Sequence, residues 1–344
     1  MTGATPIPGA LMFAEAASAH EAVSEQLACA QFAELGARLR ALSPRAVATC
    51  ARGSSDHAAT FAKYLIETRA GVLTTSVAPS VLSLYRAQAP LKDVLLLIIS
   101  QSGASPDLVA AALAAKDAGA FVLALVNAPN SPVAEAADAT APLCAGAEKS
   151  VAATKSFIAS LSAITALVAH WTADASLKQA LEDGPDLLRK AWSLDWGAAS
   201  PALVEAQSMY VIARGLGLGC AGEAALKFKE TCLIHAEAFS AAEVRHGPMA
   251  LVRTGFPALL FAQSDATREG VTDLAVDLCA SGANVFIAGA EVDGARRLPT
   301  LEAHPALQPM LQVQSFYRLA HAIALARGCD PDRPPHLQKV TETL

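Results

Sequence analysis

The sequence is poor in charge and has no concentrated basic segment. Charged residues make up only 17% of the 344 residues, and the formal net charge is −6. A nucleic-acid-binding surface needs a cluster of lysine and arginine side chains, so we expect no nucleic-acid partner. A small anionic ligand would have to be held by local groups rather than by the overall field of the protein.

Paired cysteines and long apolar runs are also missing. The seven cysteines form no CxxC pair and no spacing typical of a metal site. We therefore interpret them as small core residues and expect a reducing, cytoplasmic location. No apolar run reaches the length of a membrane span, and the first residues lack a basic segment followed by an apolar core, so we expect neither membrane insertion nor secretion.

Apolar residues make up 53% of the chain, and its length suits two domains, each with its own core. We expect one long or two shorter helices over residues 11–42, and a helix from near Ser150 through Trp171. A helical connector and a closing helix over residues 309–327 follow. The expected domains are a helical segment (1–44), a first domain (45–175), the connector (176–204), a second domain (205–327) and a proline-containing tail (328–344).

Two turns carry the residues that typically bind a phosphate. Ser100-Gln101-Ser102-Gly103-Ala104-Ser105 follows an apolar run and precedes a helical pattern that begins near Pro106, and Arg52-Gly53-Ser54-Ser55 has a similar setting. Such turns offer an anion the unpaired N–H groups of a helix start together with short hydroxyl side chains. The alternative interpretation is that these serines are ordinary helix N-caps.

An internal duplication is visible from these landmarks. Arg52-Gly53 recurs as Arg214-Gly215, and Gln101-Ser102 recurs as Gln263-Ser264, each 162 residues later. The pattern predicts two copies of one doubly wound α/β unit. Because Asp265 follows in the second copy and would repel a phosphate, we expect only the first copy to bind one.

Glu223, Lys227 and Glu230 fall at i, i+4 and i+7 of a predicted helix and so line one stripe. The spacing alone is also typical of an exposed salt-bridged face. However, the neighbouring residues are mostly apolar, which indicates that the charges are partly desolvated. A carboxylate in that environment suits general acid–base chemistry.

Three further features allow more than one interpretation. His246 lies in a loop fixed by Gly247-Pro248, near Glu243 and Arg245, and either a structural or a catalytic role is open. Lys339 is an ordinary tail lysine unless its site shields it for reaction with a carbonyl. Gly217-x-Gly219-x-x-Gly222 matches the dinucleotide fingerprint, but Glu237 and Glu243 are not expected on a strand, so we favour close helix–strand packing over NAD binding.

Taken together, the motifs resemble the tandem sugar isomerase (SIS) domain family, in particular the isomerase half of glucosamine-6-phosphate synthase, from about residue 12 to 344. The motifs that carry the resemblance are Arg52-Gly53-Ser54-Ser55, Ser100-Gln101-Ser102-Gly103, Val151-Ala152-Ala153-Thr154-Lys155-Ser156, Glu223 to Glu230, His235-Ala236-Glu237, Arg245-His246-Gly247-Pro248 and the Lys339 tail. The implied fold is α/β, with two tandem doubly wound (flavodoxin-like) parallel-sheet SIS domains and flanking helices.

The resemblance also implies roles for individual residues. Glu230 would move a proton between C1 and C2 of a sugar, His246 would assist ring opening, in trans from a partner subunit, and Lys339 would meet the open-chain carbonyl. The partners would be a small-molecule sugar phosphate and a second copy of the chain in a homodimer, and no motif requires a metal or redox cofactor. The residues that would bind the substrate are Ser54, Ser55, Ser100, Gln101, Ser102, Ser105, Val151, Glu223 and Lys227.

Two departures from the synthase pattern shape the functional expectation. The chain begins Met1-Thr2 without a cysteine-nucleophile amidohydrolase segment, so glutamine-dependent synthesis is not expected. The turn reads Gly103-Ala104-Ser105 where the synthase reads Gly-Glu-Thr, and the segment after Glu148 is also altered, as in free-standing SIS-type glucosamine-6-phosphate deaminases. We therefore expect a deaminase that converts glucosamine 6-phosphate to fructose 6-phosphate and ammonia. The alternatives are an aldose–ketose isomerase, a non-catalytic sugar-phosphate sensor and an oxidoreductase.

Overall fold

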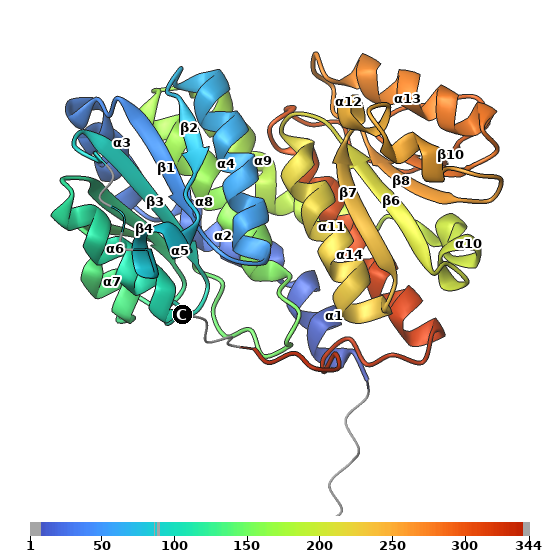
Figure 1. Ribbon diagram of the computed structural model, residues 1–344, viewed down its shortest axis with the longest axis horizontal. Helices are drawn as coiled ribbons and strands as arrows, with labels where there is room; N and C mark the ends of the chain where they lie inside the picture. Colours follow the sequence, from blue (N-terminus) through green and yellow to red (C-terminus); the bar gives the residue numbers. More distant parts are fainter. Residues whose placement is uncertain (1–7, 86, 88–89, 340–344) are drawn as a thin grey trace, which may run out of the picture. The chain divides into compact units, whose positions relative to one another are not determined.

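The computed structural model describes residues 8–85, 87 and 90–339 (Figure 1). These residues form two compact units, each built on one five-stranded parallel sheet. The β1–β5 unit contains described residues of the segments 19–146 and 156–185, and the β6–β10 unit contains residues 8–18, 147–155 and 186–339. The short N-terminal segment therefore belongs with the second sheet, although it precedes the first in sequence.

The first sheet has the order β2-β1-β3-β4-β5, and all its strand pairs are parallel. All seven residues of β3, the central strand, are buried, as a strand covered on both faces requires. The expected flavodoxin-like α/β fold is confirmed. The strands are β1 (Ala46–Cys50), β2 (Thr74–Ser76), β3 (Val94–Ser100), β4 (Phe121–Val126) and β5 (Ala139–Pro142).

The second sheet repeats this order. Read from β7, it runs β7-β6-β8-β9-β10, so the strand that comes first in sequence again lies between the second and the third. The pairs are again parallel. This shared topology agrees with the internal duplication seen in the sequence. The strands are β6 (Ser208–Ala213), β7 (His235–Ser240), β8 (Pro257–Phe261), β9 (Asn284–Ala288) and β10 (Arg296–Leu298).

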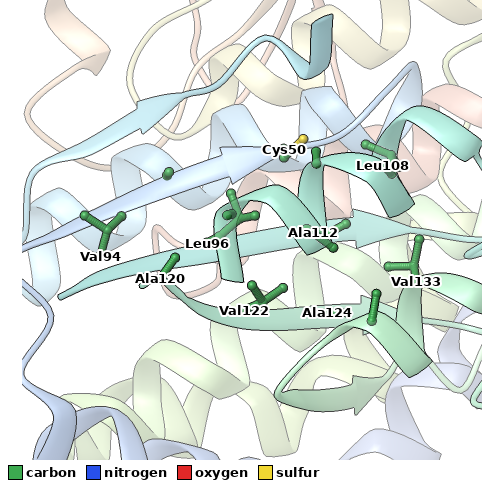
Figure 2. Packing of buried hydrophobic residues seen from close by; sticks show 14 of the residues in the cluster. Cys50, Val94, Leu96, Leu108, Ala112, Ala120, Val122, Ala124 and Val133 are labelled. Carbon is green, nitrogen blue, oxygen red and sulfur yellow. The ribbon is translucent and has the colours of Figure 1, made fainter. Parts of the chain in front are cut away.

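Short apolar side chains fill one face of the first sheet. Figure 2 shows residues of β1, β3 and β4, such as Leu96 and Val122, packed against Leu108 and Ala112 of α6. The many alanines of α6 let the helix approach the sheet closely. The helices with most of their residues in this unit are α2 (Ala19–Leu27), α3 (Gln31–Leu42), α4 (Ser54–Arg69), α5 (Pro79–Ser83), α6 (Pro106–Asp117), α7 (Pro132–Ala136), α8 (Lys155–Trp171) and α9 (Ala175–Trp192).

In the β6–β10 unit, α12 and α13 pack on the sheet in a similar apolar cluster, while α11 contacts β6, β7 and α14. This arrangement buries most of α11, including the charged side chains of Glu223 and Lys227. The helices are α1 (Ala10–Ala17), α10 (Ser200–Val204), α11 (Gly217–Cys232), α12 (Ala241–Val244), α13 (Arg268–Ala280) and α14 (Gln308–Ala326), with 3₁₀ turns η1 (Gly197–Ala199) and η2 (Pro248–Leu251). None of the described helices is long and apolar enough to cross a bilayer.

Three sequence predictions of secondary structure were wrong. Residues 11–42 form three helices rather than one or two. The helix expected from near Ser150 begins only at Lys155, because contacts with α1 hold residues 149 and 150 in a loop. Glu237, expected outside any strand, lies in the middle of β7, whereas Glu243 lies on α12 and so is off the strands as expected.

Glycines occupy the duplicated turns for a conformational reason. Gly53 and Gly215, which follow β1 and β6, have φ values of 54° and 61°. Gly103 has φ 62°, and a Cβ atom there would lie only 2.0 Å from the Ser131 Oγ. Other residues rarely adopt this left-handed conformation, so the turns need glycine.

We expect Gly103→Ala to destabilise the protein more than Gly71→Ala. Both glycines have positive φ, 62° and 67°, but nothing lies within 4 Å of a Cβ at Gly71. The conformational cost alone is about 1–2 kcal/mol, and overpacking at Gly103 adds about 1–3 kcal/mol. Urea unfolding followed by circular dichroism measures both; equal losses would contradict the close approach of Ser131 to Gly103.

Candidate active site

The first candidate turn joins β1 to α4. Helix α4 begins at Ser54, and its N-cap is Gly53, which makes no side-chain cap. Ser54 and Ser55 therefore occupy the first turn of the helix, where the N–H of Ser55 donates to the carbonyl oxygen of Arg52 at 3.1 Å. The alternative interpretation of Ser54 and Ser55 as N-caps is wrong for this turn.

The second candidate turn joins β3 to α6 and is fixed by its own serines. The Oγ of Ser100 accepts a hydrogen bond from the N–H of Gly103 at 3.0 Å, and the Oγ of Ser102 accepts one from Ala104 at 3.3 Å. Ser105 is the N-cap residue of α6 but makes no side-chain cap. Because β1 and β3 are adjacent and parallel, the two turns lie at the same edge of the sheet, where α/β proteins bind ligands.

An ion pair that sequence reasoning missed connects these two turns. The Nε and Nη2 atoms of Arg52 lie 2.8 and 2.7 Å from the Oδ2 of Asp107, whose carboxylate is fully buried in the first turn of α6. The pair fixes the start of α6 against the turn before α4. In the sequence, the only indication of this ion pair is that Arg52 and Asp107 each lie next to one of the serine turns.

The corresponding turn of the second copy is closed by its own side chains. The Oδ1 of Asp265 accepts hydrogen bonds from the N–H and Oγ1 of Thr267, at 2.8 and 2.6 Å. The N–H of Ser264 donates to the Oε1 of Gln308 at 2.6 Å. An internal carboxylate and an amide thus take donors that a phosphate would need.

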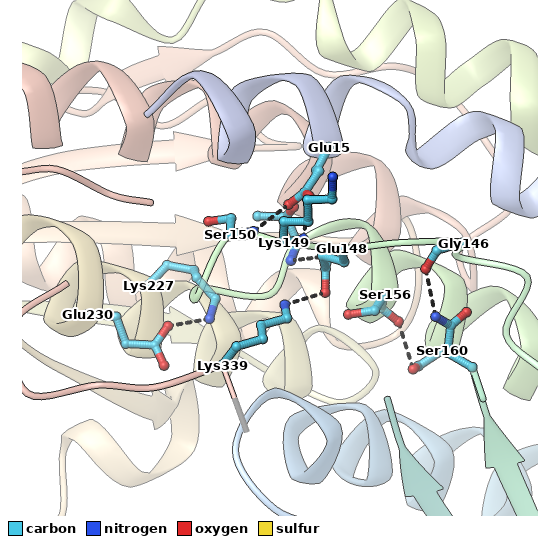
Figure 3. Close-up of polar contacts among 12 residues, drawn as sticks. Glu15, Gly146, Glu148, Lys149, Ser150, Ser156, Ser160, Lys227, Glu230 and Lys339 are labelled. Atoms are coloured by element: carbon cyan, nitrogen blue, oxygen red, sulfur yellow. Dashed lines mark hydrogen bonds and ion pairs between the residues drawn. The ribbon is translucent and has the colours of Figure 1, made fainter. Parts of the chain in front are cut away.

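The charged stripe of α11 is buried, as its apolar neighbours predicted. The side chains of Glu223 and Lys227 are 0% and 1% exposed, whereas that of Glu230 is 20% exposed. The Nζ of Lys227 lies 3.5 Å from the Oε1 of Glu223 and makes a closer ion pair with the Oε2 of Glu230 (Figure 3). The interpretation as an exposed salt-bridged face is wrong, because the stripe is inside the protein.

Tyr317 of α14 completes this row, and sequence reasoning missed it. Its fully buried hydroxyl donates to the Oε1 of Glu223 at 3.0 Å. Burial, followed by the charge of Glu223, raises the pKa of Tyr317 well above its usual value, so the phenol stays protonated. For Lys227, burial alone would lower the pKa, but the carboxylates of Glu223 and Glu230 outweigh it, so the pKa is raised and the amine stays charged.

Lys339 is held by a second missed residue, Glu148. Its Nζ donates to the Oε2 of Glu148 at 3.0 Å, and the Oε1 of the same carboxylate accepts the N–H of Thr154 at 3.0 Å (Figure 3). Glu148 is fully buried, while Lys339 is 23% exposed. The charge of Glu148 also contributes to the raised pKa of Lys227, so both lysines belong to one electrostatic cluster. We call Glu148, Glu223, Lys227, Glu230 and Lys339 the carboxylate–lysine cluster.

Val151 and His246 have different settings. The N–H of Val151 donates to the carbonyl oxygen of Asp332 at 3.2 Å, in the loop that carries Glu148. His246 is exposed in the turn between α12 and η2. Across the described residues, no hydrogen bond or ion pair joins its imidazole to the carboxylate–lysine cluster. Its role in trans stays a prediction.

The glycine fingerprint has a packing role. Gly217, Gly219 and Gly222 all lie inside α11 rather than in the turn before it. A Cβ at Gly217 would lie 2.3 Å from the Nε2 of Gln263, so the glycine permits close packing. Within the described part of the chain, no group of three or more histidine, cysteine or acidic residues could hold a metal ion.

We expect Lys227→Met to destabilise the protein by about 3–5 kcal/mol, because it leaves the carboxylates of Glu223 and Glu230 without their buried counter-ion. Lys190→Met is the matched control, since Lys190 pairs with Asp186 at 3.0 Å on the surface. That exposed pair is screened by water and salt and contributes little to stability. Denaturant unfolding compares the two, and similar losses would contradict the burial of the charged row.

Comparison with known proteins places this chain in a family. A family model described as the SIS domain matches residues 43–170 and 202–288. The glutamine–fructose-6-phosphate aminotransferase (isomerizing) of Aeropyrum pernix is 36% identical over 309 residues, which are 83% of this chain and 49% of that protein. The chain spans about half the length of the curated relatives it matches.

Solved structures agree with this assignment. One from Silicibacter pomeroyi, provisionally described as a phosphosugar isomerase, is 41% identical with a TM-score of 0.90, covering 94% of this chain and all (100%) of that one. The glucosamine-6-phosphate deaminase of Thermotoga maritima has a TM-score of 0.72 at 20% identity, covering 95% of this chain and 100% of that one, and shows the shared fold only. The chain belongs to the SIS domain family.

Proposed function

We propose that this protein is a sugar-phosphate deaminase/isomerase that converts glucosamine 6-phosphate and water to fructose 6-phosphate and ammonia. The observation that carries the proposal is the row of α11, in which a buried ammonium holds the partly exposed carboxylate of Glu230. A carboxylate held in this way can accept a proton from the substrate and return it to the substrate, without the proton being lost to solvent. The names of the relatives from Aeropyrum pernix and Silicibacter pomeroyi, both of which include isomerisation, support the reaction class.

Glu230 is the proposed acid–base group. In the open-chain amino sugar, whose amine is neutral at this step, Glu230 removes the proton from C2 while the Lys339 ammonium donates a proton to the C1 aldehyde oxygen, so the enolamine forms. Glu230 then returns a proton to C1, which leaves an iminium group at C2. Water adds to C2, the proton that it releases returns to Lys339, and ammonia departs, so one water is consumed for each ammonia released.

The lysines assist this proton transfer in different ways. Lys227 keeps Glu230 oriented through its ion pair, and Glu223 and Tyr317 hold Lys227 from the other side. Lys339 meets the open-chain carbonyl with an ammonium held by Glu148. Because Lys339 is partly exposed and Lys227 is not, Lys339 is the lysine suited to contact a substrate.

The charge of the carboxylate–lysine cluster favours an amino sugar over a neutral sugar. Its carboxylates, of which Glu230 is the most exposed, complement a cationic amine at C2 when the sugar binds. An aldose–ketose isomerase acting on neutral sugar phosphates is the nearest alternative.

The phosphate of the sugar is assigned to the turns of the β1–β5 unit. They supply short polar side chains at two helix starts: Ser100 and Ser102 act as acceptors in the turn bonds described above, and a hydroxyl that accepts can also donate its hydrogen to an anion. Since Arg52 is already paired with Asp107, these donors carry little net charge. The proposed phosphate-binding residues are Ser54, Ser55, Ser100, Gln101, Ser102 and Ser105.

We expect purified protein to release ammonia from glucosamine 6-phosphate, and Glu230→Gln to lower kcat by about 10²–10⁴-fold, the usual contribution of a general base. The variant keeps the size of the side chain and should still bind the sugar phosphate. Coupled detection of ammonia and fructose 6-phosphate measures turnover, and calorimetry measures binding.

The same assay separates the alternatives. Interconversion of neutral sugar phosphates without ammonia from the amino sugar would identify an aldose–ketose isomerase. Tight binding by the wild type with no turnover of either substrate class would identify a sensor. Unchanged turnover in Glu230→Gln would remove Glu230 from the mechanism.

We also expect Ser102→Ala to raise the KM for the sugar phosphate by about tenfold or more, because a hydrogen bond to a charged group contributes about 1.5–3 kcal/mol. Ser264→Ala is the matched control, since Ser264 occupies the same position in the closed turn of the second copy. Its KM should stay within about twofold of the wild type. Equal effects of the two substitutions on KM would contradict phosphate binding by the first copy alone.

A further inference from the structure

Helix α1 is joined at its start to the tail that carries Lys339. The two carboxylate oxygens of Asp332 accept the N–H groups of Leu11 and Met12, at 3.0 and 2.7 Å. Asp330 accepts the N–H of Gly9 at 3.1 Å. A carboxylate at a helix N-terminus satisfies donors that have no partner within the helix and is favoured by the helix dipole. The tail thus caps a helix more than 300 residues away in sequence.

The same helix is joined to the loop that carries Glu148. The carboxylate of Glu15 accepts the N–H groups of Lys149 and Ser150, the latter at 3.1 Å (Figure 3). Glu15 is buried, so these bonds are shielded from water. The N–H of Val151 in turn donates to the carbonyl oxygen of Asp332. The loop, α1 and the tail therefore form a closed set of contacts.

The tail itself has little structure that could fix Lys339. Residues 329–339 contain no helix or strand, and within this segment only turn-type bonds, such as Arg333 N–H to Asp330 carbonyl, are found among its described residues. Asp332, whose side chain makes the bonds to α1 described above, is also buried. The bonds from Asp332 and Asp330 to the start of α1, together with the Val151–Asp332 bond, therefore hold the part of the tail that precedes Lys339.

We propose that α1 is a clasp that aligns the Glu148–Lys339 pair, with Asp332 and Glu15 as its positioning residues. Asp332 fixes the tail that carries Lys339, and Glu15 fixes the residues directly after Glu148. Neither touches the reacting atoms; both act through the pair. The functional part of this inference rests on the proposed role of Lys339 at the substrate carbonyl, whereas the mechanical part does not.

Asp332→Asn tests the clasp, because an asparagine keeps the size of the side chain but has only one acceptor oxygen for two N–H donors. Hydrogen exchange of the unliganded full-length protein is measured by mass spectrometry. We expect exchange to rise by at least about tenfold, as for loss of a bond to a charged group, in α1 and in residues 147–154 and 333–339. Glu15→Gln should raise exchange in the same three segments.

Asp174→Asn is the matched control. Its carboxylate accepts the N–H of Leu177 at 3.0 Å at the start of α9, which is a helix cap away from the clasp. This variant should leave exchange of the three clasp segments unchanged. If Asp332→Asn loosens the tail alone, or if neither clasp variant changes exchange, the clasp is overturned.

Steady-state kinetics test the functional part. We expect kcat for the amino-sugar phosphate to fall by at least about tenfold in both clasp variants, with KM within about threefold of the wild type because the proposed phosphate contacts remain. If the clasp variants raise hydrogen exchange in all three segments but leave kcat of an active enzyme unchanged, Asp332 and Glu15 are not positioning residues for catalysis. If the wild type turns over no sugar phosphate, the proposed function fails, while the exchange data still decide whether α1 is a clasp.

Discussion

The burial of the Lys227 ammonium is the constraint on which the rest of the site depends. An unpaired charge inside a protein is strongly unfavourable, so Lys227 must be surrounded by groups that compensate it. Glu223 and Glu230 do so from the same helix, and Tyr317 brings α14 against α11 by its bond to Glu223. Because Lys227 is closer to Glu230 than to Glu223, the ammonium is directed toward the exposed end of the row. A structural requirement, neutralising a buried charge, thus orients the carboxylate that can reach a substrate.

The two copies of the fold show how one turn can serve two purposes. Gln101-Ser102 and Gln263-Ser264 have the same residues in equivalent places, yet their surroundings differ. After Ser102 the chain continues with Gly103 and Ala104, whose N–H groups are shaped into a turn by serine hydroxyls. In the second copy, Asp265 places a carboxylate among the donors. The shared dipeptide reflects the shared fold, and the residues that follow it decide which groups close the turn.

Local sequence predicted the sheets and the α11 stripe, but not the long-range contacts that complete the site. Strand positions followed from buried apolar runs, so β1, β3 and β6 were placed to within two residues. The i, i+4, i+7 spacing and apolar neighbours predicted the buried stripe. By contrast, Tyr317 meets Glu223 across 94 residues, and Lys339 meets Glu148 across 191. No local pattern encodes such pairs. The helix predicted from near Ser150 begins only at Lys155. Glu15, 135 residues away in sequence, holds the N–H of Ser150 in a loop, and no local pattern indicates that contact.

Within each unit, the cations are paired with carboxylates before any ligand binds. In the β1–β5 unit, the cation nearest in sequence to the serine turns, Arg52, is bound to the buried Asp107. The turns therefore present hydroxyl groups rather than a free cation, and such groups act on an anion only at short range. In the β6–β10 unit, both lysines of the carboxylate–lysine cluster are paired with carboxylates. Each ammonium is thus directed at its own carboxylate, and in the proposed mechanism this pairing keeps Glu230 and Lys339 oriented.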